Sequence, residues 1–249
     1  EKFPTDPLGH SGLKSCDLQL NPPKAARVTI EKPKEINSKY SDYSAIFSGG
    51  EVEAVYFSSM RFSGKRKGLN RITGQGPSKL FVQQKDSKGK WKKPEPIEEF
   101  AESTFDDGAL CLADDGKELY FTRCRFDNTK ILGAEVFRSK RTAGLWGEPE
   151  LVPLSGDSLV SAHPAMAPDN LTLYFVSDKP EGKGGKDIWK VTRDTPDGEW
   201  GQPINLDYPV NTKGDELFPT VAPDGTLYFS SDGHAGVGGL DIFRLGKND

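Results

Sequence analysis

The sequence has few of the residues that build metal sites and disulfide frameworks. Its 249 residues include 3 histidines and 3 cysteines. An odd, small number of cysteines excludes a disulfide scaffold, and scattered histidines without a tight thiol cluster give no support for a zinc site. No run approaches the ~18 apolar residues of a membrane span, and residues 1–20 lack the apolar core of a signal peptide. A net charge of −4 gives no reason to expect nucleic acid or an anionic membrane surface as a partner.

Helical periodicity is also almost absent, and a β-strand pattern recurs instead. Four Tyr-Phe pairs, each after a short apolar alternation, begin at Tyr56, Tyr120, Tyr174 and Tyr228. A second strand signal that ends in an aromatic residue follows each pair, and a Trp-x-x-Pro segment follows the first three. The pairs are 64, 54 and 54 residues apart, and a period of this length indicates an array of supersecondary units.

The best-preserved copies show the order of elements within a unit. They read HPAMAPDNLTLYFVS and FPTVAPDGTLYFSS: a strand, a tight turn and a second strand. Asp-Gly between apolar alternations predicts a hairpin in which both turn positions need positive φ. The glycine-rich stretches at 177–189 and 231–243 lead to a third strand and predict a loop that needs unrestricted φ. They lack the Gly-Lys-Ser/Thr ending of a phosphate loop. Trp-x-x-Pro supplies a fourth strand, because proline suits a sheet edge.

Four strands per unit, repeated four times, predict an all-β fold: a WD-like β-propeller of four-stranded antiparallel blades. If the chain is a piece of a longer protein, a fifth blade is a further possibility. The last unit lacks its fourth strand, and residues 28–37 have that strand's pattern, so we expect them to close the last blade. Residues 28–249 then form the propeller. Residues 1–27 are an N-terminal extension, in which GLKSCDLQL is a candidate helical stub of a preceding domain.

Several segments of the aligned repeats resemble a known family. They are YFTRC (120–124), AHPAMAPD (162–169), LYFVSDKPEGKGGKDIW (173–189), WGQPINL (200–206) and GDELFPTVAPDGTLYFSSDGHAGVGGLDIF (214–243). These segments resemble the Pro-Asp type of WD-like repeat and, more narrowly, the propeller of PorE-like lipoproteins of the type IX secretion system. The resemblance covers residues 26–249.

The resemblance implies a periplasmic parent protein that is associated with the outer membrane. It implies other secretion-system proteins at the outer membrane as partners. The family's lipid anchor and its peptidoglycan-binding module are not expected within these residues, so peptidoglycan would be bound only through that absent module. Neither nucleic acid binding nor direct membrane insertion is expected.

Charged residues are predicted to gather on one face of the propeller, where the first strand of each blade starts and the loop between strands two and three lies. Alignment on the tight turn places Asp107 and Glu216 at one equivalent position, with Asp42 matching them and Ser161 in the third repeat. Basic residues follow strand two on the same side. The candidate partner-binding residues are Asp42, Arg61, Asp107, Arg123, Arg125, His163, Lys179, Glu216 and His234.

This ring of carboxylates has three interpretations. The first is catalysis, because a pair of acids at the mouth of a propeller can hydrolyse glycosides. Repeated acids can instead tie a blade to its neighbour through backbone N–H groups or an adjacent arginine, or they can dock a partner. Repetition favours the structural role, because catalysis needs carboxylates with separated pKa values. The repeated aromatic residues, including Trp91, Trp146 and Trp200, predict core or inter-blade packing rather than a sugar platform.

The sequence therefore favours a non-catalytic interaction scaffold with no cofactor and no metal. The resemblance implies that the parent protein is a periplasmic part of the type IX secretion machinery that links the outer-membrane assembly to the cell wall. The alternatives are a propeller glycoside hydrolase and a carbohydrate- or peptidoglycan-binding lectin module. Asp178 and Asp187, with counterparts Asp232 and Asp241, could bracket a calcium ion through loop carbonyls, but no sequential multi-oxygen loop is visible.

The cysteines of the second repeat are predicted to stay unpaired. The Asp115-Gly116 turn sets Cys111 opposite Tyr120 and Cys124 opposite Asp107. This register leaves the two thiols about four residues apart along the strands, which is too far for a disulfide bond.

Overall fold

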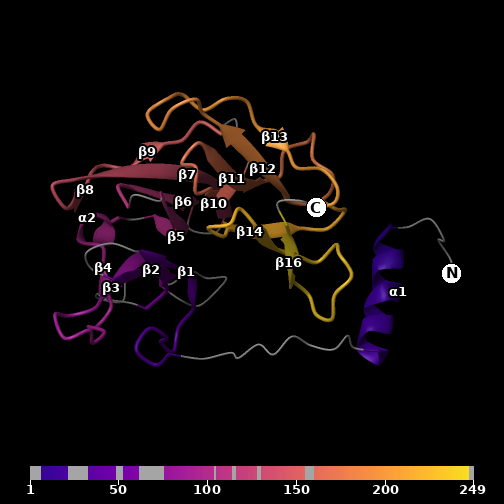
Figure 1. Cartoon of the computed structure of the whole chain (residues 1–249), viewed down its shortest axis with the longest axis horizontal. Helices are drawn as coiled ribbons and strands as arrows, with labels where there is room; N and C mark the ends of the chain where they lie inside the picture. The colour runs from indigo at the N-terminus through magenta and orange to yellow at the C-terminus, as the bar shows by residue number, and fades with distance from the viewer. Residues whose placement is uncertain are drawn as a thin grey trace.

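The computed structural model describes residues 7–21, 33–48, 53–61, 76–103, 105–113, 116–127, 130–154 and 160–246, and the side chains of residues 125–132 lie outside this description. The fold is a four-bladed β-propeller, as predicted. Four antiparallel sheets are arranged in a ring, with their first strands around the centre (Figure 1).

Each blade is an antiparallel meander whose strands follow chain order from the centre of the ring outward. Blade 1 contains β1 (Asp42–Ser48), β2 (Ala54–Ser59), β3 (Lys79–Gln84) and β4 (Glu95–Pro96). Blade 2 contains β5 (Asp106–Leu112), β6 (Glu118–Asp127), β7 (Lys130–Thr142), β8 (Leu145–Trp146) and β9 (Glu150–Leu151). Blade 3 contains β10 (Ser161–Met166), β11 (Thr172–Ser177), β12 (Asp187–Thr192) and β13 (Ile204–Asn205). Blade 4 contains β14 (Glu216–Val221), β15 (Leu227–Ser231) and β16 (Asp241–Leu245), and the helices are α1 (Pro7–Leu20) and α2 (Glu98–Ala101).

The tight turns between the first two strands have a different conformation from the predicted one. The N–H of Asn170 donates to the Ala167 carbonyl at 3.0 Å, and the N–H of Gly225 donates to the Ala222 carbonyl at 2.9 Å. Asn170 has φ of 57° and Gly225 has φ of 87°, while the preceding Pro-Asp residues have negative φ. One left-handed residue after a corner is typical of longer hairpin loops, whereas the predicted two-residue turn needs two. Proline favours this corner because its ring holds φ near about −65°.

The glycine-rich loops before β12 and β16 need glycine for space and not for positive φ. A Cβ at Gly184 would lie 2.6 Å from the backbone carbonyl carbon of Lys213, in the chain that leads into blade 4. A Cβ at Gly233 would lie 2.8 Å from the backbone nitrogen of Gly214. Neither Gly184 nor Gly233 has positive φ. The prediction of unrestricted φ is therefore wrong, and the close approach of neighbouring loops is the physical reason for these glycines.

Each innermost strand has a bulge at the same place. One residue in each bulge has a left-handed φ: 53° at Ser44, 44° at Ala109, 49° at His163 and 51° at Phe218. The pairing register with the second strand shifts at each of these positions. Such φ values are uncommon for residues other than glycine, and bulges re-aim side chains. All four residues line the central channel of the ring.

Aromatic side chains pack between neighbouring blades, as the repeats predict. Trp146 meets Tyr56 of β2 edge-on, with ring centroids 6.4 Å apart, and Trp200 meets Tyr120 of β6 in the same way at 6.5 Å. Both tyrosines are buried. These rings therefore join blade 1 to blade 2 and blade 2 to blade 3, and they do not form an exposed sugar platform.

The chain before β1 packs on blade 1 and not on blade 4. Residues 33–37 include a turn, and Ile36 packs against a buried cluster of blade 1 that includes Phe57. The prediction that residues 28–37 form the fourth strand of the last blade is wrong for this part, and residues 28–32 lie outside the described residues. Within the described part of the chain, blade 4 ends at β16 with three strands.

Helix α1 contains the segment predicted to be helical and packs beside blade 4 (Figure 1). The Ser11 hydroxyl donates to the Gly233 carbonyl at 2.8 Å. The N–H of Gly236 donates to the Ser15 hydroxyl at 3.1 Å. The helix is therefore attached to the loop between β15 and β16, a contact that the sequence did not predict.

The cysteine prediction is confirmed with one correction. Cys111 lies opposite Tyr120, but Cys124 lies opposite Asp106 rather than Asp107. The bulge at Ala109 causes this difference of one residue. All three cysteines of the chain are unpaired.

Candidate functional site

The strand register places the aligned acidic residues at equivalent positions, as predicted. Asp42 pairs with Ser59, Asp107 with Arg123 and Glu216 with Ser231. Each partner lies three residues after the tyrosine of its Tyr-Phe pair. Ser161, the third member of the ring, pairs with Ser177 in the same register.

Asp42 is surrounded by donors from its own blade. It accepts hydrogen bonds from the Ser38 backbone and hydroxyl at 2.6 and 2.8 Å, and from the Ser59 hydroxyl at 2.5 Å. Arg61 adds an ion pair at 2.8 Å. Burial alone would raise the pKa of Asp42, but hydrogen bonds from Ser59, Arg61 and Ser38 outweigh it and hold the pKa below its usual value.

Asp107 and Glu216 are completely buried. Both oxygens of Asp107 accept hydrogen bonds from the Arg123 guanidinium, at 2.7 and 2.9 Å. Glu216 accepts hydrogen bonds from the Thr212 backbone at 2.8 Å, and from the Thr212 and Ser231 hydroxyls at 2.6 Å. Their burial agrees with the structural role that the repetition favours. It corrects the placement of these two residues on the partner-binding face, because donors inside the fold bind both carboxylates.

Two acidic residues that the sequence analysis missed join neighbouring blades. Asp106 accepts a hydrogen bond from the Ser78 backbone at 2.8 Å, and Asp215 accepts one from the Lys186 backbone at 2.8 Å. Ser78 and Lys186 each precede the third strand of the preceding blade. The local signal was an acidic residue directly before the ring position, in the dipeptides Asp-Asp at 106–107 and Asp-Glu at 215–216.

The basic residues of the predicted face also contact the protein itself. Arg61 lies over the Phe57 ring at 4.9 Å and donates to the Ile36 carbonyl. Arg123 lies over the Phe105 ring at 4.9 Å. These two cations therefore hold the fold together. Lys179 is partly exposed, with its ammonium 5.8 Å from the Trp189 ring. Arg125 belongs to β6, and its side chain lies outside the described residues.

The potential calcium ligands accept hydrogen bonds from the protein. Asp178 accepts one from the Val160 backbone at 2.8 Å, and Asp187 accepts one from the Asn205 amide at 2.9 Å. No group of three His, Cys, Asp or Glu residues suited to a metal ion forms in the described ranges.

His163 lines the central channel, whose volume is about 310 Å³. Its ring stacks on Phe218 with centroids 4.0 Å apart, and its Nδ1 accepts a hydrogen bond from the Phe218 backbone at 3.3 Å. Burial, with a contribution from the charge of Lys186, lowers the pKa of His163 to about 4. The described residues that line this channel include no carboxylate.

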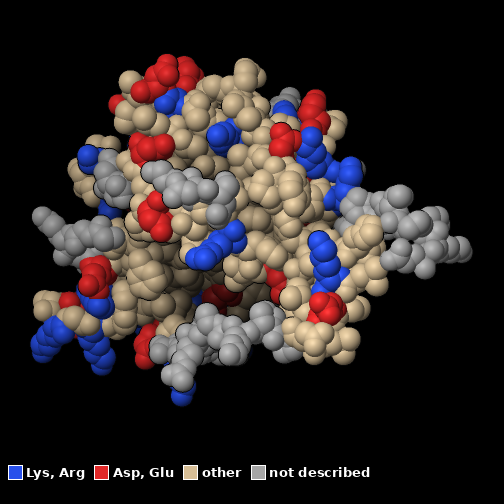
Figure 2. Space-filling view, turned by 45° about the vertical axis from the view of Figure 1, so that its right-hand side comes forward, with Lys and Arg blue, Asp and Glu red and all other residues tan. Residues whose placement is uncertain are grey.

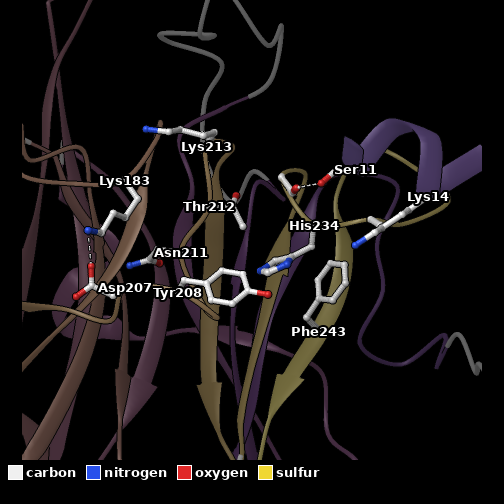
Figure 3. Close-up of a pocket in the computed structure, with 12 residues that line it drawn as sticks. Ser11, Lys14, Lys183, Asp207, Tyr208, Asn211, Thr212, Lys213, His234 and Phe243 are labelled. Carbon is white, nitrogen blue, oxygen red and sulfur yellow. Dashed lines mark hydrogen bonds and ion pairs between the residues drawn. The ribbon is translucent and has the colours of Figure 1, made fainter. Parts of the chain in front are cut away.

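A larger cleft of about 760 Å³ lies on the predicted face, between α1 and the loops of blades 3 and 4 (Figure 3). Its lining comes from α1, the loop before β12, the segment between β13 and β14, and the loop before β16. Of the predicted site residues, His234 lines this cleft, and its Nε2 lies 2.9 Å from the Val210 carbonyl.

The cleft is locally basic in an acidic protein. Its lining contains Lys14, Lys183 and Lys213 against one acidic residue, Asp207, which is 2.7 Å from Lys183. Tyr208, which also lines the cleft, is 81% exposed. On the face of the protein that Figure 2 shows, acidic and basic side chains are interspersed. The cleft therefore offers positive charge and aromatic surface together.

No protein-family model and no curated protein matches the chain. Solved structures resemble it in fold. The α-L-arabinofuranosidase from Lactobacillus brevis has a TM-score of 0.51 at 12% identity, over 82% of this chain and 71% of that chain. The GH43 endo-arabinanase from Bacillus licheniformis has a TM-score of 0.47 at 14% identity, over 90% and 80%.

A puromycin-hydrolyzing peptidase from Mycobacterium tuberculosis has a TM-score of 0.47 at 14% identity, over 84% of this chain. The chain spans 30% of that peptidase. At 12% identity and a TM-score of 0.51, the likeness to the arabinofuranosidase supports the propeller fold alone. Among the described helices, none is long and apolar enough to cross a membrane.

Proposed function

We propose that this propeller is a non-catalytic scaffold that docks another protein on the face where its first strands begin. The observation that carries the proposal is the basic cleft of about 760 Å³ on that face, formed by loops from two blades and by α1. Clefts of this size are common binding sites in proteins. The partner class follows from the resemblance to PorE-like lipoproteins: periplasmic or outer-membrane components of a type IX secretion machinery.

The chemistry of the acidic residues supports a scaffold over a glycosidase. A glycosidase needs two accessible carboxylates, separated by roughly 5–9 Å, on either side of the bond that it cleaves. Asp107 and Glu216 are buried and fully hydrogen-bonded, and the described lining of the central channel contains no carboxylate. Neither these two residues nor the described lining of the channel therefore offers a pair of accessible carboxylates that fits this mechanism.

The test is affinity capture with the purified protein from periplasmic and outer-membrane extract, followed by mass spectrometry and by reconstitution with each purified candidate. We expect one outer-membrane component to bind directly. Lys179→Glu, on the predicted face, should weaken this binding, because it reverses one charge of a docking surface. Lys88→Glu is the matched control, since Lys88 lies in the loop between strands three and four, at the opposite end of the blade.

The rival functions are tested on the same preparation. Release of sugar from arabinan or aryl arabinosides would overturn the scaffold proposal in favour of a hydrolase. Sedimentation with purified peptidoglycan, without capture of any protein, would favour the lectin alternative.

A further inference from the structure

We propose that the cleft between α1 and blade 4 binds an extended, acidic segment of a partner protein. This inference rests on the proposed function and deepens it by naming the chemistry of the segment that docks. It follows from three features of the described residues: unneutralised lysines, exposed aromatic surface, and an open strand edge beside them.

The positive charge of the cleft is largely unneutralised. Lys14 comes from α1 and Lys213 from the segment before β14, and both are exposed (Figure 3). Within the described ranges, neither has an acidic partner within 4.0 Å. Lys183 shares the cleft with Asp207, so the lining carries three cations and one anion. The chain as a whole has a charge of −4, so the excess of positive charge is local to this cleft. A local excess of positive charge favours an anionic ligand.

Aromatic residues line the cleft between the lysines. Tyr208 and His234 both line the cleft (Figure 3). The His234 ring packs on Phe243 of β16, with centroids 4.9 Å apart. An exposed tyrosine and a packed aromatic pair in one cleft offer apolar surface, which is typical of binding anchors. The ligand therefore combines acidic groups with apolar ones.

The strand β16 favours a peptide over an anionic sugar as this ligand. In blades 1, 2 and 3, the carbonyls of Leu80, Val136 and Ile188 each accept a backbone hydrogen bond from the outermost segment of the blade. The equivalent residue in blade 4, Ile242, meets no fourth strand in the described part of the chain and is 79% exposed. Phe243, its neighbour, lines the cleft. An extended peptide could pair its backbone with this edge, while a sugar has no such pattern of donors and acceptors.

The test uses a fluorescein-labelled peptide of alternating glutamate and valine with one tyrosine, titrated with the whole chain and followed by fluorescence anisotropy. Two exposed ion pairs account for roughly a tenfold change in the dissociation constant. We therefore expect the double variant Lys14→Gln/Lys213→Gln to bind about tenfold more weakly than the wild type. The matched control is Lys88→Gln/Lys90→Gln, which removes the same charge from an exposed turn of blade 1 and should bind as the wild type does.

Backbone pairing is tested with the same peptide methylated at alternate backbone nitrogens. Methylation removes the N–H donors and leaves the charge unchanged, so we expect it to weaken binding by about tenfold as well. Equal binding of the cleft and control variants would overturn the proposed site. Competition by oligogalacturonate as effective as that by the peptide would overturn the choice of a peptide.

The result can be separated from the proposed function. If an outer-membrane component is captured directly but the cleft variants change neither its binding nor that of the peptide, the scaffold role holds and this site is wrong. If no protein binds the wild type at all, the scaffold proposal fails first. Thermal midpoints of all variants must match the wild type, which is expected for substitutions of exposed lysines.

Discussion

The imidazole of His163 in blade 3 accepts a hydrogen bond from the backbone N–H of Phe218 in blade 4, and the two rings stack 4.0 Å apart. Similar bonds join blade 1 to blade 2 and blade 2 to blade 3. The Ser44 hydroxyl accepts the Leu110 N–H at 3.1 Å, and the Thr122 hydroxyl accepts the His163 N–H at 2.9 Å. The bulge in each of these inner strands leaves a backbone N–H without a partner in its own sheet. A side chain on the first or second strand of the preceding blade accepts a hydrogen bond from that N–H.

His163 should make the stability of the domain depend on pH. Its pKa is about 4 in the folded protein and about 6.5 in an unfolded chain. Between these pH values the unfolded chain binds a proton at this histidine and the folded protein does not. The contribution of His163 to the free energy of unfolding is therefore fully present above about pH 6.5 and is lost as the pH falls toward 4. His163→Phe keeps a stacking ring and removes the titration. We expect the variant to lose about 2 kcal/mol less than the wild type between neutral pH and about pH 4.5 in urea unfolding experiments.

The control for that experiment is His10→Gln, because His10 is exposed on α1. It should retain the pH dependence of the wild type. At neutral pH, His163→Phe should also be about 1 kcal/mol less stable, because the Phe218 N–H loses its acceptor. Identical pH profiles for the wild type and His163→Phe would contradict the assigned role.

Gly184→Ala should destabilise the fold, because the added methyl group would lie 2.6 Å from the backbone of Lys213. Backbone atoms of the next blade must then move, at a cost of roughly 1–3 kcal/mol. Gly238→Ala is a matched substitution in the equivalent loop of blade 4, with no atom within 4 Å of the added Cβ. It should change the free energy of unfolding by less than about 0.5 kcal/mol. Chemical denaturation of the two variants checks the difference, and similar losses in both would refute the close-approach explanation.

Arg123→Leu should be strongly destabilising, by roughly 3–5 kcal/mol, because it leaves the buried carboxylate of Asp107 without its partner. The double variant Asp107→Asn/Arg123→Leu should recover part of this loss, since no buried charge remains. Denaturant titrations of the wild type, both single variants and the double variant give the coupling energy. Additive effects in this cycle would mean that the pair is not coupled.

One thiol should react quickly in the native protein. Cys16 is exposed, whereas burial raises the pKa of Cys111 to about 12 and that of Cys124 to about 11. Thiolate is the reactive form, so an aromatic disulfide reagent at mildly alkaline pH should label one site rapidly in the folded protein. The unreduced, unfolded protein should show three reactive thiols, because all three cysteines are unpaired. Cys16→Ser should remove the fast phase, and a fast phase that persists in this variant would contradict the burial of the other two.

The fold and the equivalence of the acidic positions could be predicted from the sequence because both follow from local rules. Alternating side chains and a short turn determine a hairpin register over a few residues, and four repeats of that pattern determine the blades. Asp42, Asp107 and Glu216 therefore occupy equivalent positions in the structure. The same local reasoning failed by one residue at Cys124, where the bulge at Ala109 inserts an unpaired residue.

The direction in which each charge faces was decided by the tertiary structure. Asp107 and Arg123 were placed on the candidate partner-binding face from the sequence, yet Asp107 is completely buried and its carboxylate pairs with Arg123 across two strands. The cleft combines α1 with loops around Lys183, Lys213 and His234, which are far apart in the chain. No local sequence pattern predicts this arrangement. The burial of a charge and the charge balance of a cleft depend on which segments, separated in the sequence, the ring of blades brings together.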